Sequence, residues 1–227
     1  MKSRLYRVSK YLLIAGLAVL AIGLSATGFS LSKNSSAKKT VTQSVQKQVS
    51  NSSIVTAAIT LPPSTDKITP SAYDRYTVAA DLPRYILIPK IGVQAIVEQL
   101  GVTTTNQLES PSNIYQAGWY TGSAKPGQPG AMVIDGHVAS WSTQGVFYNL
   151  SSLKAGDKIA IERGDGTILN YEVVKTQVWN VADVDMQAVQ QPINPTKPGL
   201  NLITCTGSVT PETSEFNQRL VIFAEQI

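Results

Sequence analysis

The sequence predicts an all-β domain, folded as a barrel or a sandwich, that follows an apolar anchor and a Ser/Thr-rich linker. Three observations lead to this prediction. Residues 11–32 carry no charged side chain, a polar stretch follows them, and from about residue 82 short β-rich runs alternate with Gly and Pro. The chain of 227 residues is long enough for one domain with an appendage.

The apolar segment 11–32 predicts a transmembrane helix. A helix of this length spans roughly 33 Å, close to the hydrocarbon thickness of a bilayer. We therefore expect a cytoplasmic basic segment at 1–10, a single-pass anchor in the cell membrane, and an extracellular domain. The alternative is a cleavable signal peptide, because the small residues at 24–26 resemble a cleavage site. Basic residues on both sides make the charge bias shallow: Lys2, Arg4, Arg7 and Lys10 before the segment, Lys33, Lys38 and Lys39 after it.

Residues 33–81 are predicted to be a flexible linker. Fifteen of the forty residues from 32 to 71 are Ser or Thr and none is aromatic, so this stretch has little apolar surface to bury. The linker would hold the domain away from the membrane without fixing its position.

The charge distribution argues against nucleic acid as a partner. Residues 1–71 hold nine Lys or Arg and one acid, a net charge of +8, whereas 72–227 hold ten Lys or Arg and fourteen acids, a net charge of −4. The basic character belongs to the tail, and the predicted domain offers no basic stripe for phosphates.

The composition also argues against cofactors and metals. One cysteine excludes an intrachain disulfide framework and an iron–sulfur cluster, and one histidine leaves too few imidazoles for a typical zinc site. The acids around Glu98, Glu109 and Asp183 fit no EF-hand spacing, and no Gly-rich nucleotide loop occurs. We expect no cofactor and no metal, and the three tryptophans are interpreted as packing residues.

Residues 82–227 are predicted to form the folded domain with seven or eight short strands. Gly164-Asp165-Gly166 indicates a hairpin, and Asp183–Gln190 suits a short helix. The β-rich runs are Arg84–Pro89, Gln94–Gln99, Ala131–His137, Lys158–Arg163, Ile168–Val181, Leu200–Cys205 and Arg219–Glu225.

Cys205 and His137 are the candidate catalytic pair. A lone cysteine is commonly a small buried hydrophobe, and a lone histidine commonly has a structural hydrogen bond. In an exported chain, however, a stray thiol is a liability, and His137 is the only imidazole that can activate the only thiol. Unperturbed Cys and His are both mostly neutral near pH 7, so the active thiolate–imidazolium pair is either tuned together or a minor protonation state.

Arg219 is a candidate catalytic residue because of its expected position next to Cys205. The runs that end at Cys205 and begin at Arg219 are separated by thirteen residues, 206–218. Antiparallel pairing of these two strands would make Cys205 and Arg219 neighbours, so the guanidinium could bind an oxyanion formed beside the sulfur. The alternative is an ordinary surface arginine at a strand edge.

These residues resemble the sortase family of membrane-anchored cysteine transpeptidases. The order His, Cys, Arg matches, and Asn201-Leu202-Ile203-Thr204-Cys205 resembles the sortase pattern Thr-Leu-x-Thr-Cys. Further segments look most like class F sortases: Ala117-Gly118-Trp119-Tyr120, Pro126-Gly127-Gln128-Pro129-Gly130, Gly136-His137-Val138, Phe147-Tyr148, Ala155-Gly156-Asp157 and Arg219-Leu220-Val221-Ile222-Phe223-Ala224. Asn201 replaces the usual Thr, and Ala139 stands where class F members often have Asp.

The resemblance implies a closed eight-stranded β-barrel that cuts a Leu-Pro-x-Thr-Gly-like sorting signal between Thr and Gly. Cys205 would form a thioester, His137 would transfer protons, Arg219 would stabilise the oxyanion, and Thr204 would touch the substrate. The implied partners are surface proteins that carry sorting signals, and an amine acceptor such as a peptidoglycan precursor or a pilin lysine.

The alternatives to a sortase are other cell-wall enzymes and a non-catalytic binding module. Papain-like wall hydrolases carry Cys before His, and L,D-transpeptidases place a second His just before the Cys, so neither pattern fits this sequence. The rival from another class is a non-catalytic exported β-barrel binding module, either a degenerate sortase or a surface adhesin. The intact set of His137, Cys205 and Arg219 favours the enzyme.

Overall fold

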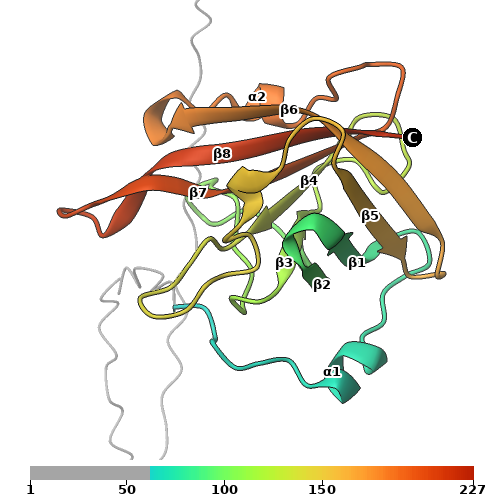
Figure 1. Cartoon of the computed structure of the whole chain (residues 1–227), viewed down its shortest axis with the longest axis horizontal. Coiled ribbons are helices and arrows are strands. Elements are labelled where there is room, and N and C mark those ends of the chain that lie inside the picture. The colour runs from blue at the N-terminus through green and yellow to red at the C-terminus, as the bar shows by residue number, and fades with distance from the viewer. Residues whose placement is uncertain (1–61) are drawn as a thin grey trace, which may run out of the picture. The chain divides into compact units, whose positions relative to one another are not determined.

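The computed structural model describes residues 62–227, and its strands close into one barrel (Figure 1). Around the barrel the order is β1-β2-β3-β4-β7-β8-β6-β5. The strands are β1 Pro83–Ile88, β2 Val93–Leu100, β3 Ala117–Tyr120, β4 Ala131–Gly136, β5 Lys158–Arg163, β6 Ile168–Asn180, β7 Gly199–Thr210 and β8 Glu215–Gln226. The predicted all-β, closed eight-stranded barrel is thereby confirmed for the described part of the chain.

The barrel interior is filled by every second side chain of its strands, as strand geometry requires. Ile134 of β4, Leu202 of β7 and Ile222 of β8 lie level with one another and are fully buried in the main core. The residues between them, such as Val133 and Ile203, belong to a second apolar cluster on the outer face of the same strands. The sheet around β7 is therefore buried on both faces, which explains the nearly continuous apolar sequence Leu200–Ile203.

Two strand pairs are parallel, β2 with β3 and β4 with β7, and the others are antiparallel. The β4–β7 pair joins segments far apart in the sequence, since Asp135 aligns with Ile203. This long-range pairing brings the end of β4 to the middle of β7, where the candidate site lies.

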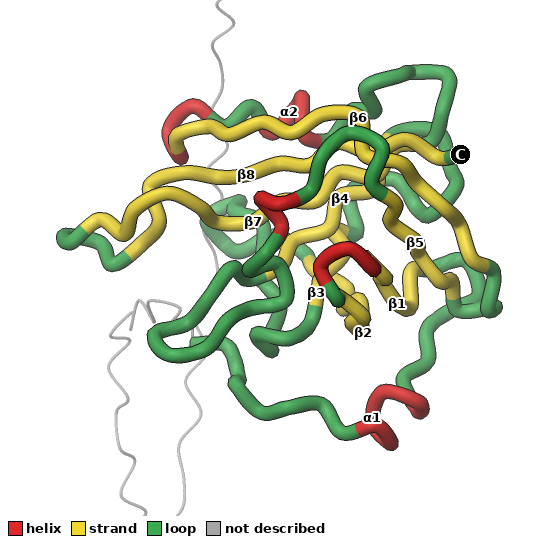
Figure 2. The backbone as a smooth tube through the Cα atoms, viewed as in Figure 1, coloured by secondary structure: helices red, strands yellow, loops and turns green. Residues whose placement is uncertain are grey.

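The β7–β8 hairpin is longer than the sequence indicated. The sequence predicts a loop for residues 206–218, which separate the two β-rich runs. In the structure most of these residues continue the two strands, and only residues 211–214 form the turn. A register shift follows Thr206, where Gly207 has a φ of +87°. The hairpin extends beyond the rest of the barrel as a two-stranded arm (Figure 2).

Short helices lie in the connections of the barrel. The 3-10 turns are η1 Pro89–Ile91, η2 Leu150–Ser152 and η3 Val181–Asp183, and the α-helices are α1 Pro70–Arg75 and α2 Met186–Val189. The predicted helix at Asp183–Gln190 thus corresponds to η3 and α2. Val189 of α2 is buried against the outer cluster of β7 and β8.

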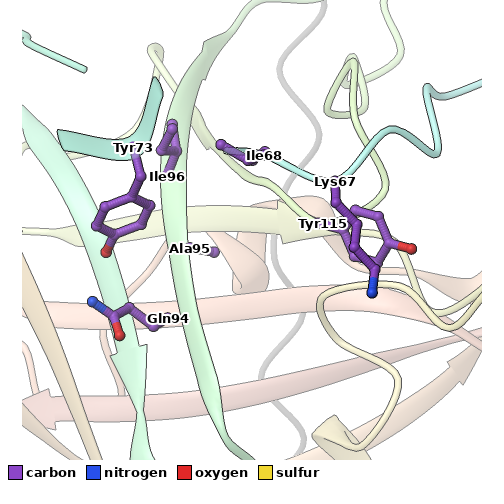
Figure 3. Close-up of a pocket in the computed structure, with 7 residues that line it drawn as sticks. All are labelled: Lys67, Ile68, Tyr73, Gln94, Ala95, Ile96 and Tyr115. Atoms are coloured by element: carbon purple, nitrogen blue, oxygen red, sulfur yellow. The ribbon is translucent and has the colours of Figure 1, made fainter. Parts of the chain in front are cut away.

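Residues 62–81, which fall in the predicted linker, lie against the barrel in this structure. Thr69 caps α1, the ring of Tyr73 stacks on Tyr85 with centroids 4.2 Å apart, and the Tyr76 hydroxyl donates to the Val97 carbonyl at 2.7 Å. Figure 3 shows a pocket of about 270 Å³ between this segment and β2. It is lined by Lys67, Ile68, Tyr73, Gln94, Ala95, Ile96 and Tyr115, and by none of the predicted site residues.

The predicted anchor at 11–32 and most of the predicted linker lie outside the described residues. Between residues 62 and 227, no helix is long and apolar enough to cross a membrane.

Candidate active site

Cys205 and Arg219 are direct cross-strand partners on β7 and β8. The antiparallel neighbourhood expected from the sequence is therefore confirmed. Residues that face each other across a ladder project from the same side of the sheet, roughly 5 Å apart. Both side chains are partly buried, and both belong to the outer face that also carries Ile203 and Val221.

His137 immediately follows β4, the strand that pairs with the Cys205-bearing β7. The parallel register pairs each β4 residue with the β7 residue 68 positions later, from Ala131 with Gly199 to Asp135 with Ile203. The same offset separates His137 from Cys205. The structure thus brings the end of β4, which His137 follows, beside β7, and it pairs Cys205 directly with Arg219 of β8.

Thr204 connects the Cys205-bearing strand to the barrel interior. Its side chain is 1% exposed, and its hydroxyl donates to the Gly136 carbonyl at 2.6 Å. Because alternate residues of a strand face opposite sides, Thr204 points inward while Cys205 points outward. The hydrogen bond keeps β7 in register with the residue just before His137. Contact between Thr204 and a substrate stays a prediction.

The backbone and the ring of His137 are both held in place. The Phe147 N–H donates to the His137 carbonyl at 2.9 Å, and Nε2 lies 2.8 Å from the Pro111 carbonyl oxygen. Because a carbonyl oxygen only accepts, Nε2 carries its hydrogen in this contact. Nδ1 is then the nitrogen that remains for proton exchange.

Arg219 is oriented by the hairpin that follows the site. Its Nη1 donates to the carbonyls of Phe216 and Gln218, each at 3.0 Å. Within the described chain, no hydrogen bond uses its Nε or Nη2. These two donors form the planar edge that an oxyanion next to Cys205 could accept from.

The thiol of Cys205 is held largely in its neutral form. Burial is the main cause that raises the pKa of Cys205 above its ordinary value; Arg219 opposes this shift, and the carboxylates of Asp135 and Glu215 add to it. A thiolate here is therefore a minor species at neutral pH. Of the two possibilities left open by the sequence, this geometry favours a minor active protonation state.

Asp135 is a titratable group at this site that sequence reasoning did not single out. It is two residues before His137 on the same strand face, and it is partly buried. Burial raises the pKa of Asp135 to about 6, against the lowering effects of His137, Ser110 and Arg219. The available signal was a carboxyl two positions before the only histidine in a strand, because period-two spacing puts both on one face.

An apolar wall flanks the site on the side of α2. Val184, Met186 and Val189 pack with Ile203 and Phe223 on the outer face. Asn201, which is fully buried, donates from Nδ2 to the carbonyls of Val189 at 2.7 Å and Gln191 at 2.9 Å. The sequence marked Asn201 only as a departure from a pattern, whereas the structure shows that it fastens this wall to β7.

No group of three or more His, Cys, Asp or Glu side chains in residues 62–227 is arranged to hold a metal ion. The acids Glu98, Glu109 and Asp183, whose spacing fits no EF-hand loop, lie on separate elements. Glu98 binds the Ser112 backbone N–H and hydroxyl, and Glu109 binds the Gly101 N–H. These carboxylates stabilise the loop between β2 and β3.

The closed barrel is the fold that the resemblance to cysteine transpeptidases implies, and it pairs Cys205 with Arg219 on adjacent strands. The family model described as "Sortase domain" matches residues 86–227. The chain belongs to the sortase family. No curated protein matches it by sequence.

Solved sortase structures share the fold. Sortase A from Corynebacterium diphtheriae is 26% identical, with 72% of this chain and 71% of that chain covered and a TM-score of 0.50. A lid mutant of the same protein is 25% identical, with 72% and 82% covered and a TM-score of 0.50. Sortase C-1 from Actinomyces oris is 25% identical, with 63% and 72% covered and a TM-score of 0.47. As a sortase, the chain is a transpeptidase that acts on proteins bearing sorting signals and on amine acceptors.

Proposed function

We propose that this chain is a membrane-anchored sortase that cuts a Leu-Pro-x-Thr-Gly-like signal between Thr and Gly. It would transfer the new carboxyl end to an amine of the cell wall or of a pilin. In this proposal the segment 11–32 anchors the chain and the barrel faces the outside. Class F is the subclass that the sequence motifs favour.

The observation that carries the proposal is the direct pairing of Cys205 with Arg219, beside the strand end that His137 follows and beside an apolar wall. A thiol alone has many uses, but a thiol opposite a guanidinium, on a strand next to the one that the imidazole follows, has the three groups that acyl transfer requires. The wall built from α2 offers an apolar surface to the side chains that precede the scissile bond.

In the first half-reaction, the Cys205 thiolate attacks the carbonyl carbon of Thr in the signal. The tetrahedral oxyanion accepts hydrogen bonds from Nε and Nη2 of Arg219. The C–N bond then breaks, and the imidazolium of His137 gives its Nδ1 proton to the departing Gly amine. A thioester between Thr and Cys205 remains.

In the second half-reaction, an acceptor amine attacks the thioester carbonyl. His137, neutral after the first step, removes a proton from this amine at Nδ1. The C–S bond breaks, an amide forms, and the thiolate and imidazolium are regenerated. Because the thiol of Cys205 is mostly neutral in the resting protein, we expect a slow first step.

Intact-mass spectrometry tests the proposal. The purified full chain, kept in mild detergent, is incubated with a Leu-Pro-x-Thr-Gly peptide library and triglycine. The expected result is an acyl adduct on the protein, release of a Gly-initiated fragment, and transfer of the acyl group to triglycine. Since the chain has one cysteine, the adduct is assigned without further mapping.

Cys205→Ala provides the control. This variant is expected to fold and to form no adduct, because the change removes only the sulfur nucleophile. Peptide cleavage that persists in the variant would contradict the thioester mechanism. A wild-type chain that is folded and alkylatable but inert to every peptide would favour the non-catalytic binding module.

A further inference from the structure

The mechanism above leaves Asp135 unused, although this residue lies on the floor of the site. On the outer face, Asp135 is level with Ile203 of β7 and Val221 of β8, one row behind the pair of Cys205 and Arg219. Its neighbours in that row are apolar, so it is an ionisable group in a place that packing alone would fill with Val or Ile. Such a placement calls for a functional explanation.

Asp135 interacts with both groups proposed to act on the Cys205 thiol, His137 and Arg219. His137, the Ser110 side chain and Arg219 each lower the pKa of the Asp135 carboxyl, against the larger effect of burial. The residue that follows Ser110, Pro111, accepts the hydrogen bond of His137 Nε2 at 2.8 Å. The loop that binds the imidazole therefore also carries Ser110, whose side chain influences the pKa of Asp135. Along the strand, alternate residues lie roughly 7 Å apart, which is close enough for a strong charge effect in a partly buried site.

We infer that Asp135 is a positioning residue of the active site, whose carboxylate is the counter-charge for the imidazolium form of His137. The inference rests on the proposed function, since it takes His137 and Cys205 as the working pair. The imidazolium is the form that protonates the leaving amine, and a nearby anion favours it. The same anion disfavours the Cys205 thiolate, as the raised pKa of Cys205 indicates.

The direction in which the titration midpoints of Cys205 and His137 should move in Asp135→Asn depends on the groups around Asp135. They are His137 after β4, Ser110 in the β2–β3 loop, Cys205 on β7 and Arg219 on β8. Removing the negative charge makes the thiol ionise at lower pH and makes the imidazolium lose its proton at lower pH. Both limbs of the pH profile of kcat/KM should then move together in the acidic direction.

Asp135→Asn in the full chain is the test variant, because Asn keeps the shape and can still accept from Ser110. Alkylation of Cys205 with iodoacetamide is followed against pH, and the imidazole resonances of His137 are followed by NMR. The single cysteine and the single histidine make each signal unambiguous. We expect both titration midpoints to fall by about one pH unit relative to wild type. Asp74→Asn, on the exposed surface of α1, is the charge-matched control and should leave both midpoints in place.

A merely structural role predicts a different result. If Asp135 only fastens the loop, both midpoints in Asp135→Asn stay within about 0.2 units of wild type and of Asp74→Asn, and the inference is overturned. Should Asp135→Asn not fold, Ser110→Ala gives the second measurement. It removes a hydrogen bond that favours the carboxylate, so both midpoints should move in the same direction by less. Unmoved midpoints there would likewise overturn the inference.

These titrations need no substrate. If the wild-type chain cleaves no peptide, the proposed function fails, yet the two midpoints still show whether Asp135 acts on His137 and Cys205. If peptides are cleaved but the midpoints do not move, the proposed function stands and the role of Asp135 is wrong.

Discussion

At the scale of single residues, the reactivity of Cys205 follows from opposing influences on its charge. Burial and the carboxylates of Asp135 and Glu215 favour the thiol, whereas Arg219 favours the thiolate. Arg219 has two separable properties, a positive charge and a planar set of donors. Substitutions that keep one property and remove the other can therefore assign its role.

Arg219→Lys and Arg219→Gln are expected to differ in a diagnostic way. Lys keeps the positive charge, so the pH midpoint of Cys205 alkylation should stay near that of wild type; Gln removes the charge, so the midpoint should rise. Both variants should lose about 100- to 1000-fold in kcat, because neither reproduces a two-pronged donor to the oxyanion. Alkylation against pH and steady-state kinetics measure the two effects. Near-normal turnover in Arg219→Lys would remove Arg219 from the oxyanion role.

Glu215→Gln should move the pH midpoint of Cys205 alkylation in the direction opposite to that of Arg219→Gln. Glu215 raises the pKa of Cys205 from the start of β8, next to the turn at 211–214, so its neutralisation should lower the alkylation midpoint. A midpoint that rises or does not move would show that the arm lies too far from the thiol to influence it in solution.

At the scale of elements, β7 joins three parts of the site. Thr204 points inward and its hydroxyl binds Gly136 of β4, whereas Cys205 points outward to the candidate site. Asn201 hydrogen-bonds the segment that carries α2. The two donors of Asn201 Nδ2 bind the carbonyls of Val189 and Gln191, and the bond to Val189 is buried. The position of the apolar wall thus depends on a single side chain of the strand that bears the nucleophile.

Asn201→Leu should loosen this wall. Loss of both donors should lower the free energy of unfolding by about 1–3 kcal/mol, and it should raise KM for peptide more than it lowers kcat. Urea denaturation and peptide kinetics test the two parts. The matched control is Asn149→Leu, because Asn149 is exposed and its side chain makes no capping bond. An unchanged KM in Asn201→Leu would mean that the wall does not contact the substrate.

At the scale of the whole molecule, the barrel keeps an ionisable group that lowers its stability. Asp135 has a pKa raised from 3.8 to about 6 in the folded state, mainly through burial. Between these values the folded state binds more protons than the unfolded state, so stability falls as pH rises through this window. A residue that destabilises the fold at neutral pH and still occupies the site is typical of functional positions.

Asp135→Asn should therefore stabilise the folded protein above pH 6 by about 1–3 kcal/mol, because Asn has no charge to desolvate. The gain should disappear below about pH 4, where Asp135 is protonated in both states. Urea unfolding of wild type and variant at pH 4 and pH 8 measures the difference. A variant less stable than wild type at pH 8 would contradict this account.

The sequence by itself determined the features that depend on local pattern. Alternating apolar residues and Gly or Pro breaks predicted most strands, and the uniqueness of Cys205 and His137 identified the candidate pair. The pairing of Cys205 with Arg219 was also predictable, because two strands close in sequence commonly pair antiparallel. The short strand β3 was not predicted as a strand, since four residues that include a glycine give too little pattern.

Only the tertiary structure decided which distant residues meet. The parallel pairing of β4 with β7 brings the strand end that His137 follows beside the strand that bears Cys205, and it depends on closure of the whole barrel rather than on any local signal. The same closure puts the Pro111 carbonyl on the His137 ring. Burial, which sets the pKa of Cys205 and of Asp135, likewise arises only when every strand is in place.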